Sequence, residues 1–444
     1  MTPQAIHRAS ESSRPLKILL VQPLSYLFSP GGAHKANRRL VQGLAERGHR
    51  CWVVAPPTER GTDPIESVLA RSRAIGAEVS QRSGEALVLR HRGVTVHCAR
   101  KGVDLCLEAL RLLRDIEPDW TIVSEDSTFL LLHEILTVRP ERVVCFAHSP
   151  ATLPFGPASF EADAERTAIV RRATGILTVS RYMQDYIAHW GGMPAEVVYS
   201  PVYGEGPFAR LTAFDRGFVT MVNPSAIKGI SVFVELARRL PDVPFAAVPT
   251  WGATAADHAL LAAQPNITLL PAVDDLDQLF SQVRVLVVPS LWGEAFGQIV
   301  VEAMLRGVPV LVSDQGGLPE SSLGVGTVVP VRRIERYLGY VDERSVPVPI
   351  VPEQEVGPWE AALRRLVGDR STYEAAAAAS HAAAERFVAA LGIEPYDRYL
   401  RQLSPLPSPP RRLERPALRE KLAGMSAEKL ELLRRRLHKQ EPAR

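Results

Sequence analysis

The stretch that most constrains the fold is residues 287–320, VVPSLWGEAFGQIVVEAMLRGVPVLVSDQGGLPE, which reads as strand, loop, helix, strand and loop. The apolar run Val285–Val288 just before it is typical of a strand buried on both faces. Apolar residues then recur at helical spacing over Gly297–Leu305, and Gly307 stands where a helix C-terminus favours glycine. Val308–Val312 predicts the next strand. This order of elements predicts a parallel sheet covered by helices.

Two carboxylates lie on either side of the predicted helix start. Glu294 is in the loop and Glu302 is on the helix. Between them, the backbone amides of Phe296–Gln298 come at a helix N-terminus, where unpaired N–H groups and the helix dipole favour an anion. We therefore expect a ligand with a negative charge above this edge of the sheet.

The beginning of the chain shows the same pattern. Lys17–Gln22 predicts a buried strand, His34–Arg47 an amphipathic helix and Cys51–Ala55 a second strand, as in a doubly wound sheet. The loop between the first two holds Gly31 and Gly32, which either let the backbone approach a ligand or simply make a tight turn. It is not a G-x-G-x-x-G fingerprint, so a dehydrogenase is less favoured.

The pattern starts again in the second half of the chain. Phe218–Val222 predicts a strand, the loop NPSAIKG follows, and Ile230–Leu240 predicts a helix. Lys228 precedes a glycine at the head of this helix, where an ammonium can neutralise a diphosphate; the alternative is a surface lysine. We predict two doubly wound domains and divide the chain as follows: a disordered N-terminus (1–15), an N-terminal domain (16–205), a C-terminal domain (206–390), a crossover helix (391–403), and a proline-rich spacer with a short helical tail (404–444).

Taken together, the motifs resemble one family. The string from PS through EAFG, followed by GVPV and GG-x-PE, is similar to the E-x7-E signature of retaining GT-B glycosyltransferases of the family 4 type, with Glu294 and Glu302 as the two glutamates. Lys228 matches the lysine of that family's R-x4-K-G pattern, but Asn223 occupies the place of the arginine. An amide brings no charge to a phosphate. The resemblance implies an α/β fold of the GT-B type, with two Rossmann-like domains facing across a cleft.

The resemblance also implies transfer of a sugar from a nucleotide diphosphate to a hydroxyl or amine of a small-molecule or carrier-bound acceptor. It implies retention at the anomeric carbon, no metal and no permanently bound cofactor. The residues that it places at the site are His148 and Glu294 as catalytic groups touching the sugar, and Gly31, Gly32, Asn223, Lys228, Phe296, Gly297, Gln298 and Glu302 as donor-binding groups, with Lys228 on the diphosphate and Glu302 on the ribose.

Several polar residues have competing interpretations. His148 follows the predicted strand Val143–Ala147 at the ligand edge, and we favour a role at the sugar over a structural one. Asp126 stands at a similar edge, but we favour a helix cap. Asp275-Leu276-Asp277 matches D-x-D, which binds a metal in another glycosyltransferase fold; capping of a short helix explains it without a metal. His34 and its neighbour Lys35 are expected at a solvated helix end.

Composition excludes some classes of protein. With 46% hydrophobic and 23% charged residues and a net charge of +3, the chain is typical of globular proteins and lacks a nucleic-acid footprint. The four cysteines have no metal or redox spacing, which predicts reduced core residues in a cytoplasmic protein. No apolar run approaches 18 residues, and the polar N-terminus lacks the apolar core of a secretory signal.

The tail leaves alternatives open. Leu430, Leu433 and Leu437 line one face of a short basic helix, which weakly resembles the docking segments of polyketide and peptide synthases and would suggest a natural-product pathway. A solvated basic tail is equally compatible with the residues. Two other functions also remain possible: a nucleotide-sugar epimerase on the same fold, and a degenerate GT-B scaffold that acts by binding a partner.

Overall fold

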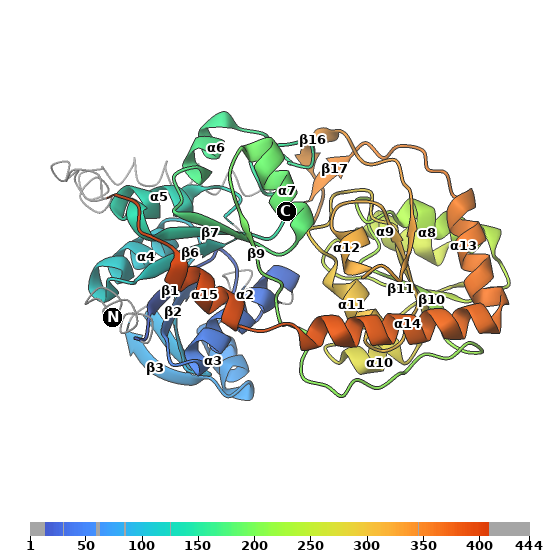
Figure 1. The fold of residues 1–444 in the computed structure, drawn as a ribbon, viewed down its shortest axis with the longest axis horizontal. Helices are drawn as coiled ribbons and strands as arrows, with labels where there is room; N and C mark the ends of the chain where they lie inside the picture. Colours follow the sequence, from blue (N-terminus) through green and yellow to red (C-terminus); the bar gives the residue numbers. More distant parts are fainter. Residues whose placement is uncertain are drawn as a thin grey trace, which may run out of the picture.

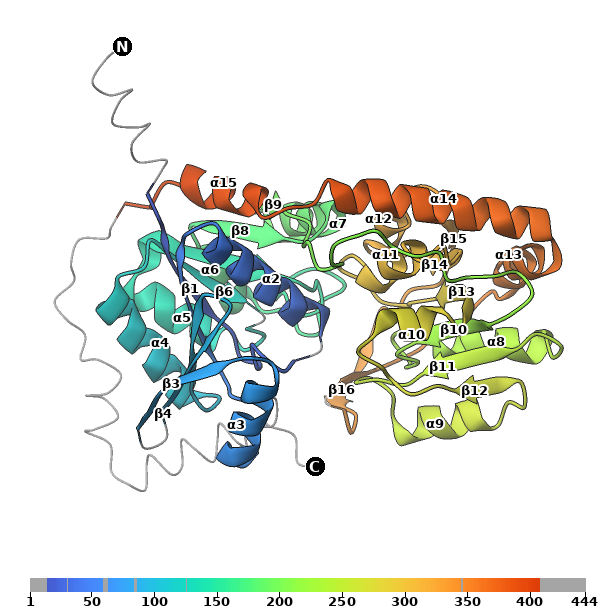
Figure 2. The same cartoon turned by 90° about the horizontal axis from the view of Figure 1, so that it is seen from below.

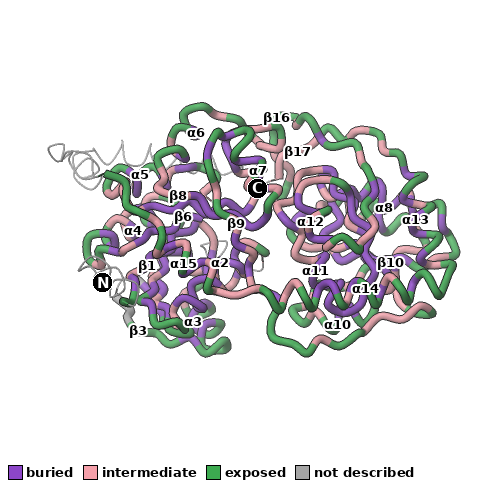
Figure 3. Tube along the Cα trace, in the orientation of Figure 1, coloured by how far each residue is buried: buried purple, intermediate pink, exposed green. Residues whose placement is uncertain are grey.

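The computed structural model describes residues 14–29, 31–58, 63–83, 86–124, 126–344 and 346–407. Two sheets, each covered by helices on both faces, lie side by side (Figure 1). This confirms the prediction of two doubly wound α/β domains. The buried residues concentrate along the strands of both sheets and the helix faces that pack on them (Figure 3). The predictions made for the tail beyond residue 407 lie outside the described residues.

The first sheet has the order β3-β4-β5-β2-β1-β6-β7-β8-β9 and is parallel except at the β3–β4–β5 edge. The central strand, KILLV, is apolar and buried after its first residue, and it pairs in register with its neighbours on both sides. At one edge the strand directions alternate, because β3, β4 and β5 pair antiparallel. The strands are β1 (Lys17–Val21), β2 (Arg50–Ala55), β3 (Glu78–Ser83), β4 (Ala86–His91), β5 (Val94–Cys98), β6 (Trp120–Ser124), β7 (Val143–Ala147), β8 (Gly175–Thr178) and β9 (Glu196–Val197).

Amphipathic helices cover this sheet. Their apolar faces follow helical spacing, as in α4, where Leu105, Ala109 and Leu112 are buried. A side chain fixes the start of one short helix: the Asp163 carboxylate accepts a hydrogen bond from the Arg166 amide and caps α6. The helical segments are α2 (Gly32–Glu46), α3 (Ile65–Ala74), α4 (Val103–Ile116), α5 (Leu130–Val138), η1 (Pro140–Arg142), α6 (Ala164–Val170), α7 (Arg181–Tyr186) and the π-helical turn η2 (Ile187–Gly191).

The second sheet is parallel, with the order β12-β11-β10-β13-β14-β15, and a small antiparallel hairpin, β16–β17, follows it. The strands are β10 (Phe218–Val222), β11 (Phe245–Val248), β12 (Ile267–Leu269), β13 (Val283–Val288), β14 (Val310–Ser313), β15 (Thr327–Val329), β16 (Tyr337–Val341) and β17 (Pro347–Pro349). The helices are α8 (Ile230–Arg239), α9 (Ala255–Ala262), α10 (Leu276–Phe280), α11 (Gln298–Met304), α12 (Leu318–Ser321) and α13 (Gly357–Gly368).

Two C-terminal helices, α14 (Arg370–Ala389) and α15 (Glu394–Gln402), run along one side of both domains (Figure 2). The α15 helix packs on the first domain, where the buried Tyr396 hydroxyl contacts Ser200 Oγ at 3.0 Å and the Val198 carbonyl at 3.2 Å. Ile393 sits against Gly43 of α2 so closely that a Cβ at the glycine would lie 2.2 Å from it. The helices α14 and α15 therefore complete the second domain and brace the first.

In the described part of the chain, no helix has both the length and the apolar character that crossing a membrane requires. All four cysteines are buried, and none of them forms a disulfide. Burial raises the pKa of Cys51, Cys98 and Cys106 to about 12, so these thiols stay protonated at neutral pH.

Candidate functional site

The loop before α11 and the first turn of this helix form the centre of the candidate site. Gly297 has a φ of 94°, a left-handed backbone that glycine adopts without strain, and this lets the loop turn into the helix. The loop carries Glu294, and α11 carries Glu302, as the sequence predicted. The Val300 amide donates to the Gly297 carbonyl at 3.0 Å, whereas the Gln298 and Ile299 amides before it have no acceptor among the described residues and are available to an anion.

The structure brings Lys228 and Glu294, which come from separate motifs, into direct contact. The Lys228 ammonium donates to Glu294 Oε1 and lies 4.7 Å from the centre of the Trp292 ring. The same carboxylate oxygen accepts from Ser290 Oγ at 2.7 Å and from Trp292 Nε1 at 2.8 Å. Burial acts to raise the pKa of Glu294, but Lys228 and the two neutral donors outweigh it and hold that pKa below its usual value. Glu294 is therefore ionised at neutral pH.

The loop after β14 packs against the backbone of Glu294. The Gly317 amide donates to the Glu294 carbonyl at 2.7 Å. Gly316 has a φ of 64°, and a Cβ there would lie 2.2 Å from the Glu294 carbonyl oxygen and 2.4 Å from its nitrogen. Because neither contact is possible for a larger residue, the two glycines of the GG-x-PE string allow the close approach that positions Glu294.

Glu302 lies on the inner face of α11 and is only 6% exposed. Burial raises the pKa of its carboxyl group above the usual value, and the positive charges of Lys35 and Arg306 only partly oppose this. Among the described residues, its carboxylate has no hydrogen-bond partner. Glu302 is thus a buried hydrogen-bond acceptor on the helix. Arg306 donates instead to the Asp277 carboxylate at 2.7 Å.

Asn223 ends β10 in a left-handed conformation with a φ of 59°, which asparagine tolerates better than most residues. Its Oδ1 accepts from the Gly252 amide at 2.9 Å, so it supports the loop after β11. Asn223 therefore supports the backbone of the loop after β11. Its buried Nδ2 and the buried Ser225 hydroxyl lie beside the loop that leads to Lys228, without a partner among the described residues.

His148 is buried just past the end of β7, on the first domain, and its ring packs against Phe146 at 3.9 Å between centroids. Its Nε2 pairs with Asn37 Oδ1 at 3.0 Å. Burial, and to a lesser extent the nearby His34, lowers the pKa of His148 to about 3. His148 is therefore neutral over the physiological range.

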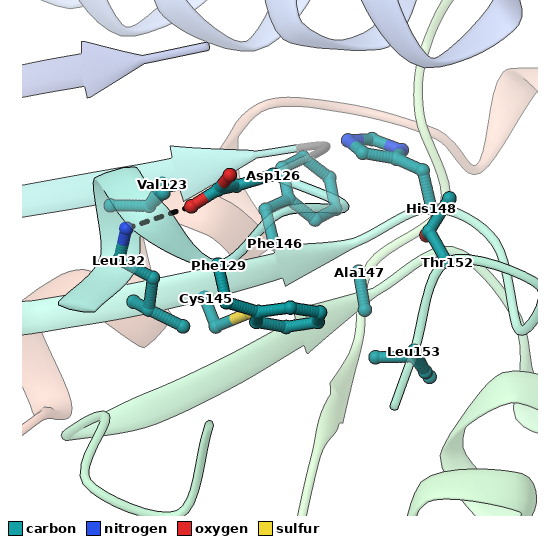
Figure 4. A pocket seen from close by; sticks show the side chains of 10 residues that line it. All are labelled: Val123, Asp126, Phe129, Leu132, Cys145, Phe146, Ala147, His148, Thr152 and Leu153. Atoms are coloured by element: carbon teal, nitrogen blue, oxygen red, sulfur yellow. Dashed lines mark hydrogen bonds between the residues drawn. The ribbon is translucent and has the colours of Figure 1, made fainter. Parts of the chain in front are cut away.

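Below His148 is a small cavity of about 20 Å³, enough for about one water molecule (Figure 4). Asp126 contributes to its wall, but its carboxylate accepts from the Leu132 amide at 2.8 Å and from the Thr128 hydroxyl at 2.9 Å. These bonds cap the start of α5, as the sequence favoured. The cavity is otherwise lined mainly by apolar side chains, which suits packing more than sugar recognition.

The start of α2 faces the start of α11 across the two domains. Gln298 Nε2 lies 3.4 Å from the Gly32 carbonyl, and a Cβ at Gly32 would meet Gln298 Oε1 at 2.8 Å. Gly31 lies against the His34 ring. The expectation that His34 lies at a solvated helix end is wrong: the helix packs it inward, and both ring nitrogens are buried without a partner in the described structure. Burial, together with Arg38 and Lys101, lowers its pKa to about 4.

Phe296 contributes its backbone rather than its ring to this region. The ring is 5% exposed and stacks on Phe387 of α14 at 5.8 Å, with Tyr199 at 5.5 Å. This aromatic group joins the site loop to the first domain and to the crossing helix. No sequence pattern predicts this group, because the three rings are far apart along the chain.

Glu320, the last residue of the GG-x-PE string, was also not identified as an interdomain residue. Its carboxylate accepts from the backbone amides of Arg181 at 3.1 Å and Tyr182 at 3.2 Å, and from the Tyr199 hydroxyl. A residue of the second domain thus caps helix α7 of the first. Ser180, at the same helix start, donates to the Ala295 carbonyl.

The D-x-D sequence has a structural role. Asp275 Oδ1 accepts from the Asp277 amide at 2.9 Å and caps α10, and Asp277 pairs with Arg306 at 2.7 Å. The prediction of a helix cap is confirmed. Within the described ranges, no group of three or more possible metal-ligating side chains is found.

Two family models match the chain, one in each domain. "Glycosyltransferase Family 4" matches residues 30–203, and "Glycosyl transferases group 1" matches residues 215–339. A protein from the capsule region of Klebsiella pneumoniae, described as uncharacterized, is 22% identical over 76% of this chain and 93% of its own length. The D-inositol 3-phosphate glycosyltransferase of Mycobacterium tuberculosis is 31% identical over 37% of this chain, and the match spans only 33% of that enzyme.

Solved structures share the fold at low sequence identity. Sucrose-phosphate synthase from Thermosynechococcus elongatus has a TM-score of 0.62 at 16% identity and covers 87% of this chain and 98% of its own. Anabaena HepE, solved with UDP-glucose, has a TM-score of 0.59 at 16% identity, covering 86% of this chain and 98% of its own. These neighbours establish the two-domain GT-B fold that the sequence predicted. With that fold, and with a glycosyltransferase family model matched in each domain, the chain is a glycosyltransferase of the GT-B type.

Proposed function

We propose that the enzyme transfers a sugar from a nucleotide diphosphate donor to an acceptor hydroxyl or amine, with retention and without a metal. The observation that carries the proposal is the Lys228–Glu294 pair beside the start of α11. The Lys228 ammonium lies beside the first amides of the helix, and this combination suits a diphosphate. The ionised Glu294 carboxylate in the same place suits sugar hydroxyls. HepE, a structural neighbour, was solved with UDP and with UDP-glucose, which supports this class of donor.

The roles follow from the chemistry of each group. The Lys228 ammonium and the amides of Phe296, Gly297 and Gln298 stabilise the negative charge that builds on the leaving diphosphate. Because these groups supply the positive field, a metal is not required at this position. Glu302 accepts hydrogen bonds from the ribose hydroxyls, and its burial makes each such bond stronger than it would be in water.

The first domain supplies the opposite wall. His148 reaches the donor sugar, while Gly31 and Gly32 allow the start of α2 to approach the ligand closely, opposite Gln298. The acceptor enters from this side, and the two walls position both reactants and exclude water. Asn223 supplies no charge, so Lys228 and the helix amides carry the diphosphate without the usual guanidinium.

Ligand binding and transfer can be tested separately. A thermal-shift panel of UDP, GDP, dTDP and ADP should show one nucleotide that stabilises the wild type, and Glu302→Ala should abolish the shift. With the corresponding sugar nucleotide, proton NMR of the product should show the same anomeric configuration as the donor. Transfer that continues unchanged in both Glu294→Ala and Lys228→Ala would contradict the proposed mechanism. The family matches and the ordered ion pair favour transfer over the epimerase and scaffold alternatives.

A further inference from the structure

A chain of buried amides connects α2 to His148. Asn37, on α2, is 0% exposed and contacts three polar side chains. Its Nδ2 lies 2.8 Å from Gln22 Oε1 and 2.9 Å from Ser124 Oγ, and its Oδ1 lies 3.0 Å from His148 Nε2. Gln22 itself is fully buried at the end of β1. None of these contacts belongs to the donor loop on the second domain.

The orientation of each amide in this chain can be deduced from one backbone group. Gln22 Nε2 lies 2.8 Å from the Leu24 carbonyl, which can only accept, so this end of the Gln22 side chain is the NH₂ group. Gln22 Oε1 must then face Asn37, and an oxygen can be satisfied there only by the Asn37 NH₂ group. Asn37 Oδ1 is left to face His148, and it requires a donor.

His148 Nε2 must therefore carry the hydrogen of this bond. Because burial keeps the imidazole neutral, only one ring nitrogen is protonated, and Nδ1 retains its lone pair. Nδ1 has no hydrogen-bond partner among the described residues. Unlike the two ring nitrogens of His34, it is not fully enclosed by protein. The ring thus offers one accessible acceptor atom that no described residue uses.

We infer that Asn37 is a positioning residue that holds His148 as the neutral Nε2–H tautomer, so that Nδ1 accepts a hydrogen bond from a hydroxyl of the donor sugar. The role at the sugar rests on the proposed function, whereas the tautomer rests only on the amide chain. A lone pair at this point accepts from a hydroxyl and repels a carboxylate, so the donor sugar must present a hydroxyl to this atom.

The groups around the ring are consistent with a neutral imidazole. His34 on α2 is buried and has a pKa lowered to about 4, and Arg38 lies one turn further along the same helix. Asp126, across the small cavity, is half-buried, and its partial burial raises the pKa of its carboxyl group; its bonds go to the start of α5. Protonation of His148 would add a second hydrogen on Nδ1 and remove the acceptor.

The tautomer can be measured in the free enzyme. In protein labelled with ¹⁵N-histidine, the His148 ring signals are assigned by their loss in His148→Gln. At pH 7, Nε2 should have the shift of a protonated nitrogen and Nδ1 that of an unprotonated one. In Asn37→Leu, which removes the acceptor, the two shifts should move toward each other as the tautomers mix. The matched control is Gln42→Met, a buried amide on the same helix that contacts His91 at 3.3 Å, and it should leave the His148 signals unchanged.

The wild-type spectrum alone decides the tautomer, even if Asn37→Leu does not fold. A protonated Nδ1, or a charged ring at pH 7, would overturn the inference. In transfer assays, Asn37→Leu should lower kcat by about tenfold or more, whereas Gln42→Met should leave kcat unchanged. An Nε2–H tautomer in an enzyme that transfers no sugar would refute the proposed function while leaving the positioning role intact. An unchanged kcat in Asn37→Leu, in protein whose spectrum shows mixed tautomers, would refute the role of Nδ1 at the sugar.

Discussion

Lys228 and Glu294 form an ion pair, with the ammonium 4.7 Å from the Trp292 ring and the carboxylate oxygen shared with two neutral donors. The two side chains are 16% and 12% exposed. A pair this sheltered costs desolvation, and it is retained only with good geometry and further hydrogen bonds. Here those bonds come from Ser290 and Trp292, in the same loop as Glu294. The pair holds the loop that carries Glu294 in place and keeps an ammonium at the position where we propose that the diphosphate binds.

Replacing Lys228 by methionine should destabilise the enzyme as well as inactivate it. The change leaves Glu294 ionised and largely buried without its cation, which costs on the order of 3 kcal/mol in comparable cases. Lys228 holds the pKa of Glu294 down, so the pair contributes stability above the usual glutamate pKa of about 4.3, and this contribution is lost as the pH falls through the lowered pKa. Urea unfolding should therefore show its largest difference from wild type at pH 7, and this difference should shrink as the pH falls below about 4.3.

A double variant provides the control for this pair. Lys228→Met combined with Glu294→Gln removes both charges and should be less destabilised than the sum of the single variants, because no buried ion is left alone. Additive effects would mean that the two side chains do not interact in solution.

Glu302→Gln should have the opposite effect on stability. Burial raises the pKa of Glu302, so its ionised form opposes folding. This penalty is absent at a pH below the pKa that Glu302 has in the unfolded chain. It grows as the pH rises through the higher pKa that Glu302 has in the folded protein. The amide should raise the melting temperature at pH 8 but not at pH 4. It should also weaken nucleotide binding by about tenfold, because a neutral oxygen accepts ribose hydroxyls less strongly. Calorimetry of unfolding and binding measures both, and a lower melting temperature at pH 8 would contradict the assignment.

Gly316 and Gly324 form a natural pair for testing how tightly Glu294 is held. Both have a positive φ, 64° and 73°, but only Gly316 lies against another backbone; a Cβ at Gly324 meets nothing within 4 Å. Gly324→Ala should cost only the strain of a left-handed alanine, about 1–2 kcal/mol. Gly316→Ala should cost more, and it should abolish transfer because it displaces Glu294. Thermal unfolding and initial rates compare the two, and similar losses in both variants would contradict the close approach.

Much of the fold could be predicted because each signal is local. The apolar run in β1 and the helical spacing in α2 are each contained within 15 residues. The strand–loop–helix string around Glu294 was predictable for the same reason. The antiparallel β3 was missed because its sequence, EVSQRS, has little apolar alternation, and its pairing with β4 supplies what the pattern lacks.

The missed parts of the site depend on contacts between distant segments. Nothing in the sequence indicates that Asn37 lies beside His148, 111 residues away, or that His34 turns inward. Trp292 stands two residues before Glu294, but its indole could have pointed to solvent; only the fold directs it to the carboxylate. Asn223 was correctly noted as a departure from the family pattern, yet its left-handed backbone and its bond to Gly252 could not be read from residue type.

The contact between Glu320 and α7 predicts that the two domains stabilise each other through one helix end. The Glu320 carboxylate accepts from the Arg181 and Tyr182 amides, which have no acceptor within α7, so it acts as an anionic cap supplied by the other domain. Glu320→Ala should leave these amides unpaired and destabilise the helix start by about 1–2 kcal/mol. Hydrogen exchange of the peptide that contains α7 should then become about tenfold faster.

Asp163→Ala is the matched control for that experiment, because Asp163 caps α6 through the Arg166 amide within the first domain. It should speed exchange in α6 and leave α7 unchanged, whereas Glu320→Ala should do the reverse. The hydroxyl of Tyr199, which also binds Glu320, allows a second check: Tyr199→Phe removes one of the bonds to the carboxylate and should give an intermediate effect on α7. Exchange in α7 that is the same in wild type and Glu320→Ala would mean that Ser180, through the Ala295 carbonyl, holds the helix start without the carboxylate.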